Sequence, residues 1–110
     1  MGNILKNVFD LPEHVRSGAR LNNEITEVIA VGGGARIERI ISTGQVSDWY
    51  NQDESEFVAL LEGAAKIEYE NGESVALSRG DTLIIKPHER HRVSYTSANP
   101  PCIWLCVFYN

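Results

Sequence analysis

The chain of 110 residues contains only two cysteines, Cys102 and Cys106, which stand four positions apart. Two cysteines are too few to staple a small secreted fold, and their spacing is not that of a Cys-x-x-Cys redox pair. In an extended strand the two side chains would share one face about 13 Å apart, which is too far for a disulfide. We therefore expect two buried free thiols.

The sequence also lacks long apolar runs and runs of basic residues. No apolar run approaches the ~20 residues that span a bilayer, and the first seven residues show no apolar segment typical of a secretory signal. Ten basic and fifteen acidic residues give a formal net charge of −5, which argues against an electrostatic nucleic-acid binder. We expect a cytoplasmic protein with no nucleic-acid and no membrane partner.

The composition that remains is that of an ordinary globular domain. The chain is 43% hydrophobic and 23% charged, which excludes a disordered or collagen-like protein. Its length suits one domain and leaves no room for a dinucleotide-binding domain joined to a substrate domain.

Short segments rich in β-branched residues follow one another along most of the sequence. A helix is expected only near Asp10-Leu11-Pro12-Glu13, with Asp10 as its N-cap. Tight turns are expected at Gly32-Gly33-Gly34 and at Asn71-Gly72. Eight strands are predicted, over residues 24–31, 35–42, 56–61, 64–70, 74–78, 81–85, 91–96 and 102–109. This pattern predicts an all-β sandwich or barrel.

Polar side chains concentrate in residues 49–56 and 86–92, each beside a predicted strand. If Glu56 and His91 face the inside of a barrel, they could meet at its mouth, where small-molecule pockets form. Strand alternation would then turn Val93 and Tyr95 inward with His91. Carboxylate, imidazole and amide or phenol oxygen suit a divalent ion such as Zn, Ni, Fe or Mn. A metal-free hydrogen bond between His91 and Glu56 is the alternative.

These two segments resemble the two motifs of the cupin superfamily. The glycine, histidine-pair, glutamate and glycine positions of the first motif fall on Gly44, Tyr50-Asn51-Gln52, Glu56 and Gly63. The second motif has glycine, Pro-x-Gly, histidine and asparagine positions, which fall on Gly80, Lys86-Pro87-His88, His91 and Tyr95. The resemblance is closest to small bacterial cupins. It implies a cupin-type double-stranded β-helix, or jelly-roll, barrel with a short N-terminal helix, forming a single cupin domain over residues 1–110.

The resemblance also implies a set of metal ligands. Metal-binding cupins hold the ion with two histidines and a glutamate of the first motif and a histidine of the second. Glu56 and His91 match directly, whereas Gln52 and Tyr50 replace the paired histidines. The implied ligands are Gln52, Glu56 and His91, joined by His88 if its turn curls inward.

Three residues near the same mouth are expected to contact an organic ligand, namely Tyr50, Tyr95 and Arg92. We expect a small cupin that holds a divalent ion (Zn, Ni, Mn or Fe) and binds or acts on a small organic molecule. The alternative is a metal-free binding or sensing barrel without catalytic activity. No catalytic residue is assigned, and whether the chain is an enzyme stays open.

The apolar C-terminal run over residues 102–109 carries Trp104, Phe108 and Tyr109. An exposed edge strand should not present so much apolar surface, so we expect this run to mediate a homodimer.

Overall fold

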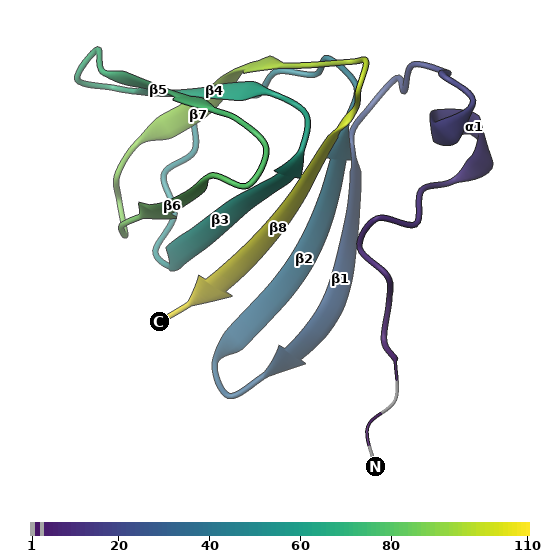
Figure 1. The fold of residues 1–110 in the computed structure, drawn as a ribbon. Coiled ribbons are helices and arrows are strands. Elements are labelled where there is room, and N and C mark those ends of the chain that lie inside the picture. Colours follow the sequence, from purple (N-terminus) through teal and green to yellow (C-terminus); the bar gives the residue numbers. More distant parts are fainter. Residues whose placement is uncertain (1, 3) are drawn as a thin grey trace.

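The protein is built almost entirely from β-strands (Figure 1). A computed structural model describes residues 2 and 4–110. The elements are α1 (Glu13–Arg16), β1 (Ile25–Gly32), β2 (Ala35–Ser42), β3 (Ser55–Glu62), β4 (Ala65–Tyr69), β5 (Ser74–Leu77), β6 (Thr82–Ile85), β7 (His91–Thr96) and β8 (Cys102–Tyr109). The eight predicted strands are confirmed, with ends shifted by at most one residue.

The strands form two antiparallel sheets with inner faces packed against each other. The larger sheet has the order β1-β2-β8-β3-β6 and the smaller one the order β5-β4-β7 (Figure 1). Both sheets contribute to one buried cluster, which includes Leu60 of β3, Ile67 of β4, Ile85 of β6 and Trp104 of β8. The all-β jelly-roll barrel predicted from the sequence is therefore confirmed.

Strand β8 lies in the middle of the larger sheet, between β2 and β3. It pairs with β2 from Ser42↔Cys102 to Ala35↔Tyr109, and its other side pairs with β3. The expectation that this apolar run forms an exposed edge is wrong, because both of its hydrogen-bonding sides are taken within the same chain. Its apolar character reflects burial, and the free edges of the larger sheet are β1 and β6.

The β1–β2 hairpin turns at the glycine triplet as predicted. Gly32 pairs with Ala35, and Gly33 and Gly34 between them have φ of +58° and +78°. Two successive left-handed residues are the requirement of a type I′ turn, and glycine adopts them without a steric penalty.

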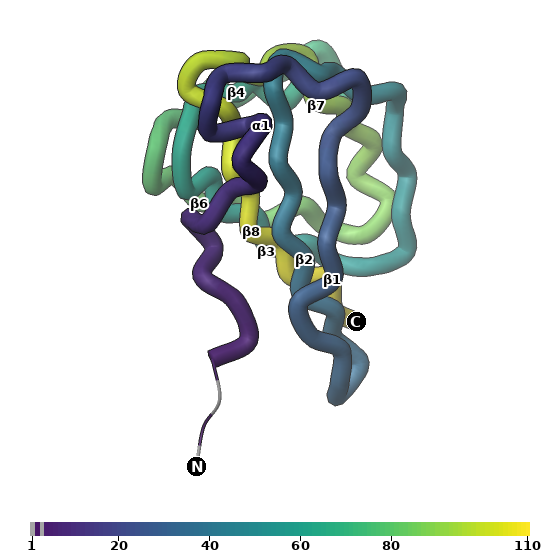
Figure 2. The backbone as a smooth tube through the Cα atoms, turned by 90° about the vertical axis from the view of Figure 1, so that its right-hand side faces the viewer, coloured from purple at the N-terminus to yellow at the C-terminus, as the bar shows by residue number. Residues whose placement is uncertain are grey.

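The N-terminal segment lies against the larger sheet (Figure 2). Its helix, α1, begins at Glu13 with Pro12 at the N-cap position and no side-chain cap, so the prediction of Asp10 as N-cap is wrong. Val15 is buried, and Arg39 of β2 donates hydrogen bonds to the carbonyl oxygens of Val8 and Asp10 at 3.2 and 2.6 Å. No helix among the described residues has the length and hydrophobicity to cross a membrane.

Candidate functional site

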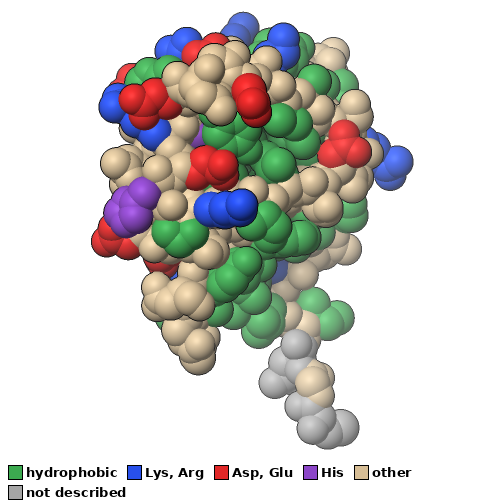
Figure 3. All heavy atoms as spheres, turned by 90° about the vertical axis from the view of Figure 1, so that its left-hand side faces the viewer, with side chains coloured by type: hydrophobic (Ala, Val, Ile, Leu, Met, Phe, Trp, Pro, Cys, Tyr) green, Lys and Arg blue, Asp and Glu red, His purple; other side chains and the backbone are tan. Residues whose placement is uncertain are grey.

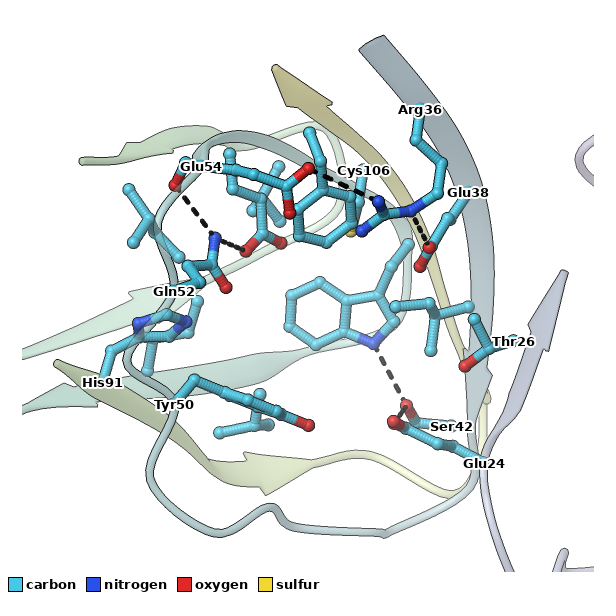
Figure 4. A pocket seen from close by; sticks show the side chains of 18 residues that line it. Glu24, Thr26, Arg36, Glu38, Ser42, Tyr50, Gln52, Glu54, His91 and Cys106 are labelled. Carbon is cyan, nitrogen blue, oxygen red and sulfur yellow. Dashed lines mark hydrogen bonds and ion pairs between the residues drawn. The ribbon is translucent and has the colours of Figure 1, made fainter. Parts of the chain in front are cut away.

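A cavity of about 370 Å³ lies between the two sheets (Figure 4). Because side chains alternate along a strand, β2 and β8 each present every second residue to it. The apolar part of its wall includes Ile40, Val58, Ile67, Trp104 and Phe108. The indole N–H of Trp104 donates to the hydroxyl oxygen of Ser42 at 3.2 Å, which fixes the ring within this wall.

Glu56 enters the cavity from the start of β3 and is 8% exposed. Its Oε1 accepts a hydrogen bond from Nε2 of Gln52 at 3.1 Å, and the thiol of Cys106 lies near the carboxylate. Burial raises the pKa of Glu56, although this amide, this thiol and the nearby His91 act in the opposite direction. Burial likewise raises the pKa of Cys106 far above its ordinary value, so this thiol stays protonated.

His91, at the start of β7, is 3% exposed and lines the same cavity. Its Nδ1 lies 2.8 Å from the carbonyl oxygen of Glu89. Since a carbonyl can only accept, Nδ1 carries the hydrogen, and Nε2 of the neutral ring holds a lone pair.

The segment before β3 is tied to His91 through the backbone. The N–H of Tyr50 donates to the carbonyl of His91 at 2.7 Å, and the reverse bond measures 3.1 Å. The two rings lie 5.6 Å apart between centroids. This bridge brings Tyr50 and Gln52 to the cavity beside β7.

Glu56 and His91 thus share the cavity without a hydrogen bond between them in the described chain. Each has another partner: Gln52 for the carboxylate, and the backbone of Glu89 for the ring. The metal-free hydrogen bond expected as an alternative is therefore not formed between these two described residues.

Sequence reasoning missed a group of charged residues on the cavity wall. Arg36 donates from Nε to Glu38 at 2.6 Å and from Nη1 to Glu54 at 3.4 Å, and its guanidinium lies 4.5 Å from the centre of the Phe108 ring. Glu24 lies at the rim, where the hydroxyl of Ser42 bonds to it. The alternation of Arg36, Glu38, Ile40 and Ser42 was the available signal, but it does not say which face of β2 is inside.

His88 lies on the β6–β7 turn, outside the set of described residues that line the cavity. Its side chain is 63% exposed, with Nδ1 2.9 Å from Oδ1 of Asn51 and Nε2 3.2 Å from Asp53. Its φ of +60° belongs to the left-handed region, which suits the glycine that the resembled motif has at this position. The turn does not curl inward.

Arg92 and Tyr95 also lie away from the described cavity wall. Arg92 pairs with Glu68 at 2.7 Å, and its guanidinium lies 4.8 Å from the Trp49 ring. Tyr95 is 50% exposed, because the register of β7 against β4 shifts between Val93 and Tyr95. A bulge of this kind inserts one residue and breaks the alternation that was expected to turn Tyr95 inward.

The residues present offer a divalent ion a weak donor set. The described residues contain no group of three or more His, Cys, Asp or Glu side chains that could hold a metal. Glu56 and His91 are strong donors, but the amide of Gln52 turns its Nε2 toward Glu56, so Gln52 donates a hydrogen bond to the carboxylate and occupies one of its lone pairs. This arrangement does not fit a tightly held resident metal.

Comparisons with known proteins agree with this architecture. The family model described as a cupin domain matches residues 38–108. The crystal structure of a candidate mannose-6-phosphate isomerase from Ralstonia eutropha JMP134 is 34% identical, with a TM-score of 0.83 and 96% of each chain covered. None of the curated proteins matches the sequence significantly.

More distant structures share the fold alone. A cupin superfamily protein from Desulfitobacterium hafniense DCB-2 is 18% identical, with a TM-score of 0.74 over 96% of this chain and 94% of that one. A DMSP lyase from Ruegeria pomeroyi DSS-3 is 14% identical, with a TM-score of 0.69 over 79% of this chain and 47% of that one. The same barrel thus occurs in proteins named for different chemistries.

Proposed function

The chain belongs to the cupin family, and from this premise we propose that its barrel binds a small organic molecule in the cavity between the two sheets. The observation that carries the proposal is the cavity itself. Its apolar wall surrounds a few convergent polar groups, the arrangement typical of small-molecule sites.

The polar groups are held in place before any ligand arrives. Gln52 orients Glu56, the backbone of Glu89 orients His91, and Ser42 orients the Trp104 ring. Binding then needs little further ordering of side chains, which favours affinity.

The substrate in the name of the Ralstonia relative does not transfer directly. A sugar phosphate needs cationic partners, and the basic residue of this cavity wall, Arg36, already pairs with Glu38 and Glu54. We therefore carry over from that relative only the binding of a small organic molecule.

Thermal-shift screening of a small-molecule library tests this function. A ligand at 100 times its Kd stabilises the fold by about 2.7 kcal/mol, so hits should raise the melting temperature. Because the proposed binding needs no metal, the rise should be the same with and without EDTA. The variant Ile40→Trp, which fills the cavity, should lose these shifts. The matched variant Ile84→Trp, at an exposed position on β6, should keep them. Equal hits for both variants would place binding elsewhere and contradict the proposal.

A divalent ion at Gln52, Glu56 and His91 is the second candidate. One observation favours it: Nδ1 of His91 donates to a backbone carbonyl, as in most metal-binding histidines, which leaves Nε2 beside Glu56 for a ligand. Elemental analysis of protein purified without a His-tag and incubated with Zn, Ni, Mn or Fe tests it. Metal that His91→Ala loses and His88→Ala keeps would support this candidate, and metal content near zero would contradict it.

The homodimer, the cytoplasmic location and the single domain over residues 1–110 stay predictions. Support for the homodimer now comes from the free edges of the larger sheet. Val28 and Val31 of β1 and Ile84 of β6 are exposed, and Figure 3 shows apolar side chains gathered on the face where β6 lies. Light scattering at micromolar concentration tests it, and a monomer would contradict it.

A further inference from the structure

We propose that the cavity selects a small organic ammonium ion over neutral or anionic molecules of the same shape. The inference rests on the proposed function, since it names the ligand class for the same cavity. Three observations carry it: the negative charge of the cavity wall, the aromatic rings beside that charge, and the hydrogen-bond acceptors on the wall that have no partner among the described residues.

The ionisable side chains of the wall are mostly acidic. Four glutamates line the cavity, Glu24, Glu38, Glu54 and Glu56, against one arginine, Arg36. These five side chains have a formal charge of −3, from one positive and four negative groups.

The single arginine is shared between two of the glutamates. Its guanidinium bonds to Glu38 and to Glu54, which lie on different strands or their flanks. Glu24 and Glu56 have no Lys or Arg partner among the described residues, and their partners are the neutral side chains of Ser42 and Gln52. These two carboxylates are therefore available to a bound cationic ligand.

The wall also shows how it holds a cation. The guanidinium of Arg36 lies 4.5 Å from the centre of the Phe108 ring while two carboxylates hold its N–H groups. This combination of ring face and carboxylate is the arrangement that stabilises ammonium ligands elsewhere. Trp104 presents a second ring to the same cavity.

Much of the free hydrogen-bonding capacity consists of acceptors, beside the hydroxyls of Tyr50 and Thr26, which can accept as well as donate. Nε2 of the buried His91 holds a lone pair and has no partner among the described residues, and the carboxylates of Glu24 and Glu56 have lone pairs to spare. An ammonium group carries only donors, so it matches this lining, whereas a phosphate or carboxylate carries only acceptors.

Three probes of one shape test the inference: phenethylamine, phenethyl alcohol and phenylacetate, titrated by calorimetry at pH 7 and low salt. We expect the amine to bind about tenfold more tightly than the alcohol, and the acid not to bind measurably. The advantage of the amine should shrink in high salt. Mannose 6-phosphate should bind more weakly than mannose.

A charge-neutralising variant locates the effect in the cavity. Glu24→Gln should weaken the amine about fivefold and leave the alcohol unchanged, because Glu24 lies at the exposed rim and its loss does not disturb the core. Glu73→Gln, in the exposed β4–β5 turn, makes the same change in net charge and should leave both probes unchanged.

Each remaining outcome overturns the inference. If the alcohol equals the amine, or phenylacetate exceeds it, charge selection is refuted while the binding cavity stands. If the amine fails to bind, the inference is refuted. The library screen with Ile40→Trp then decides whether the cavity binds any small organic molecule. If Glu24→Gln and Glu73→Gln behave alike, the selection does not arise in this cavity.

Discussion

Gly63, which follows β3, combines a left-handed backbone with a crowded position. Its φ is +92°, and a Cβ there would lie 2.9 Å from the Cα and Sγ of Cys102 and from Oγ of Ser97. We expect Gly63→Ala to lower the free energy of unfolding by roughly 3 kcal/mol, because strain and overpacking add.

Gly72 provides a control at the same φ of +92°, since nothing lies within 4 Å of its Cβ position. Gly72→Ala should lower the free energy of unfolding by about 1 kcal/mol, because only the left-handed backbone is unfavourable there. Urea unfolding measures both variants. Equal losses would mean that Cys102 and Ser97 yield easily and that packing around Gly63 is looser than described.

Glu27 makes the stability of the protein depend on acid pH. Burial by itself raises the pKa of Glu27, but hydrogen bonds from Arg39 and Lys6 outweigh it and hold the pKa below the ordinary glutamate value. A lowered folded-state pKa contributes stability that is present above the unfolded pKa and is lost as the pH falls through the folded one.

Glu27→Gln should therefore be less stable than the wild type at pH 6, and the difference should shrink between about pH 5 and pH 3. Urea midpoints across this range measure it. Glu13→Gln, which removes the exposed ion pair with Arg16, is the control and should show no such convergence. A constant difference for Glu27→Gln would show that its charge is not responsible.

At the same scale, the spacing of glycine, glutamate and histidine predicted that Gln52, Glu56 and His91 would come together, and they line one cavity. Spacing could not predict hydrogen-bond direction. The amide of Gln52 is used on Glu56 and Nδ1 of His91 on a backbone carbonyl, and both choices depend on atoms supplied by the folded chain.

At the scale of elements, apolar patterning and turn residues predicted every strand to within one residue. They could not predict the bulge in β7, since it arises where β7 must pair with β4, and it turns Tyr95 outward. They also could not show that β8 is central, because a buried apolar strand and a dimerising edge have the same sequence pattern.

The N-terminal segment with α1 depends on one side chain of β2. Arg39 is 2% exposed, pairs with Glu27 and holds the carbonyls of Val8 and Asp10. Arg39→Met should lower the free energy of unfolding by about 3 kcal/mol, since it leaves the Glu27 carboxylate and the two carbonyl oxygens without their hydrogen-bond donor in a covered position.

Hydrogen exchange locates the effect of Arg39→Met. The amides of Asp10 and Val15 should exchange faster in the variant, while amides of β3 and β8 keep their protection in native conditions. Arg16→Met, in the exposed pair of α1, is the control and should leave these amides unchanged. Uniform acceleration across all strands would contradict a local role for Arg39.

At the scale of the whole molecule, the cavity wall joins two motif segments to strands that no motif marks. Glu56 and His91 come from the segments singled out in the sequence. Glu24 directly precedes β1, and Arg36 and Glu38 lie in β2. Both faces of β2 are covered, one by the cavity and one by the N-terminal segment, so amphipathic alternation carried no information about its inner face.

The central position of β8 also sets the time the chain needs to fold. Its contacts join residues far apart in sequence, such as Ser42 with Cys102, so the larger sheet cannot close until long loops have been ordered.

We expect refolding from urea in milliseconds to seconds. Until β8 docks, β2 and β3 have unpaired edges, so slower docking, as in Ile103→Gly, should increase aggregation during refolding more than its loss of stability alone explains. Stopped-flow fluorescence together with light scattering measures both.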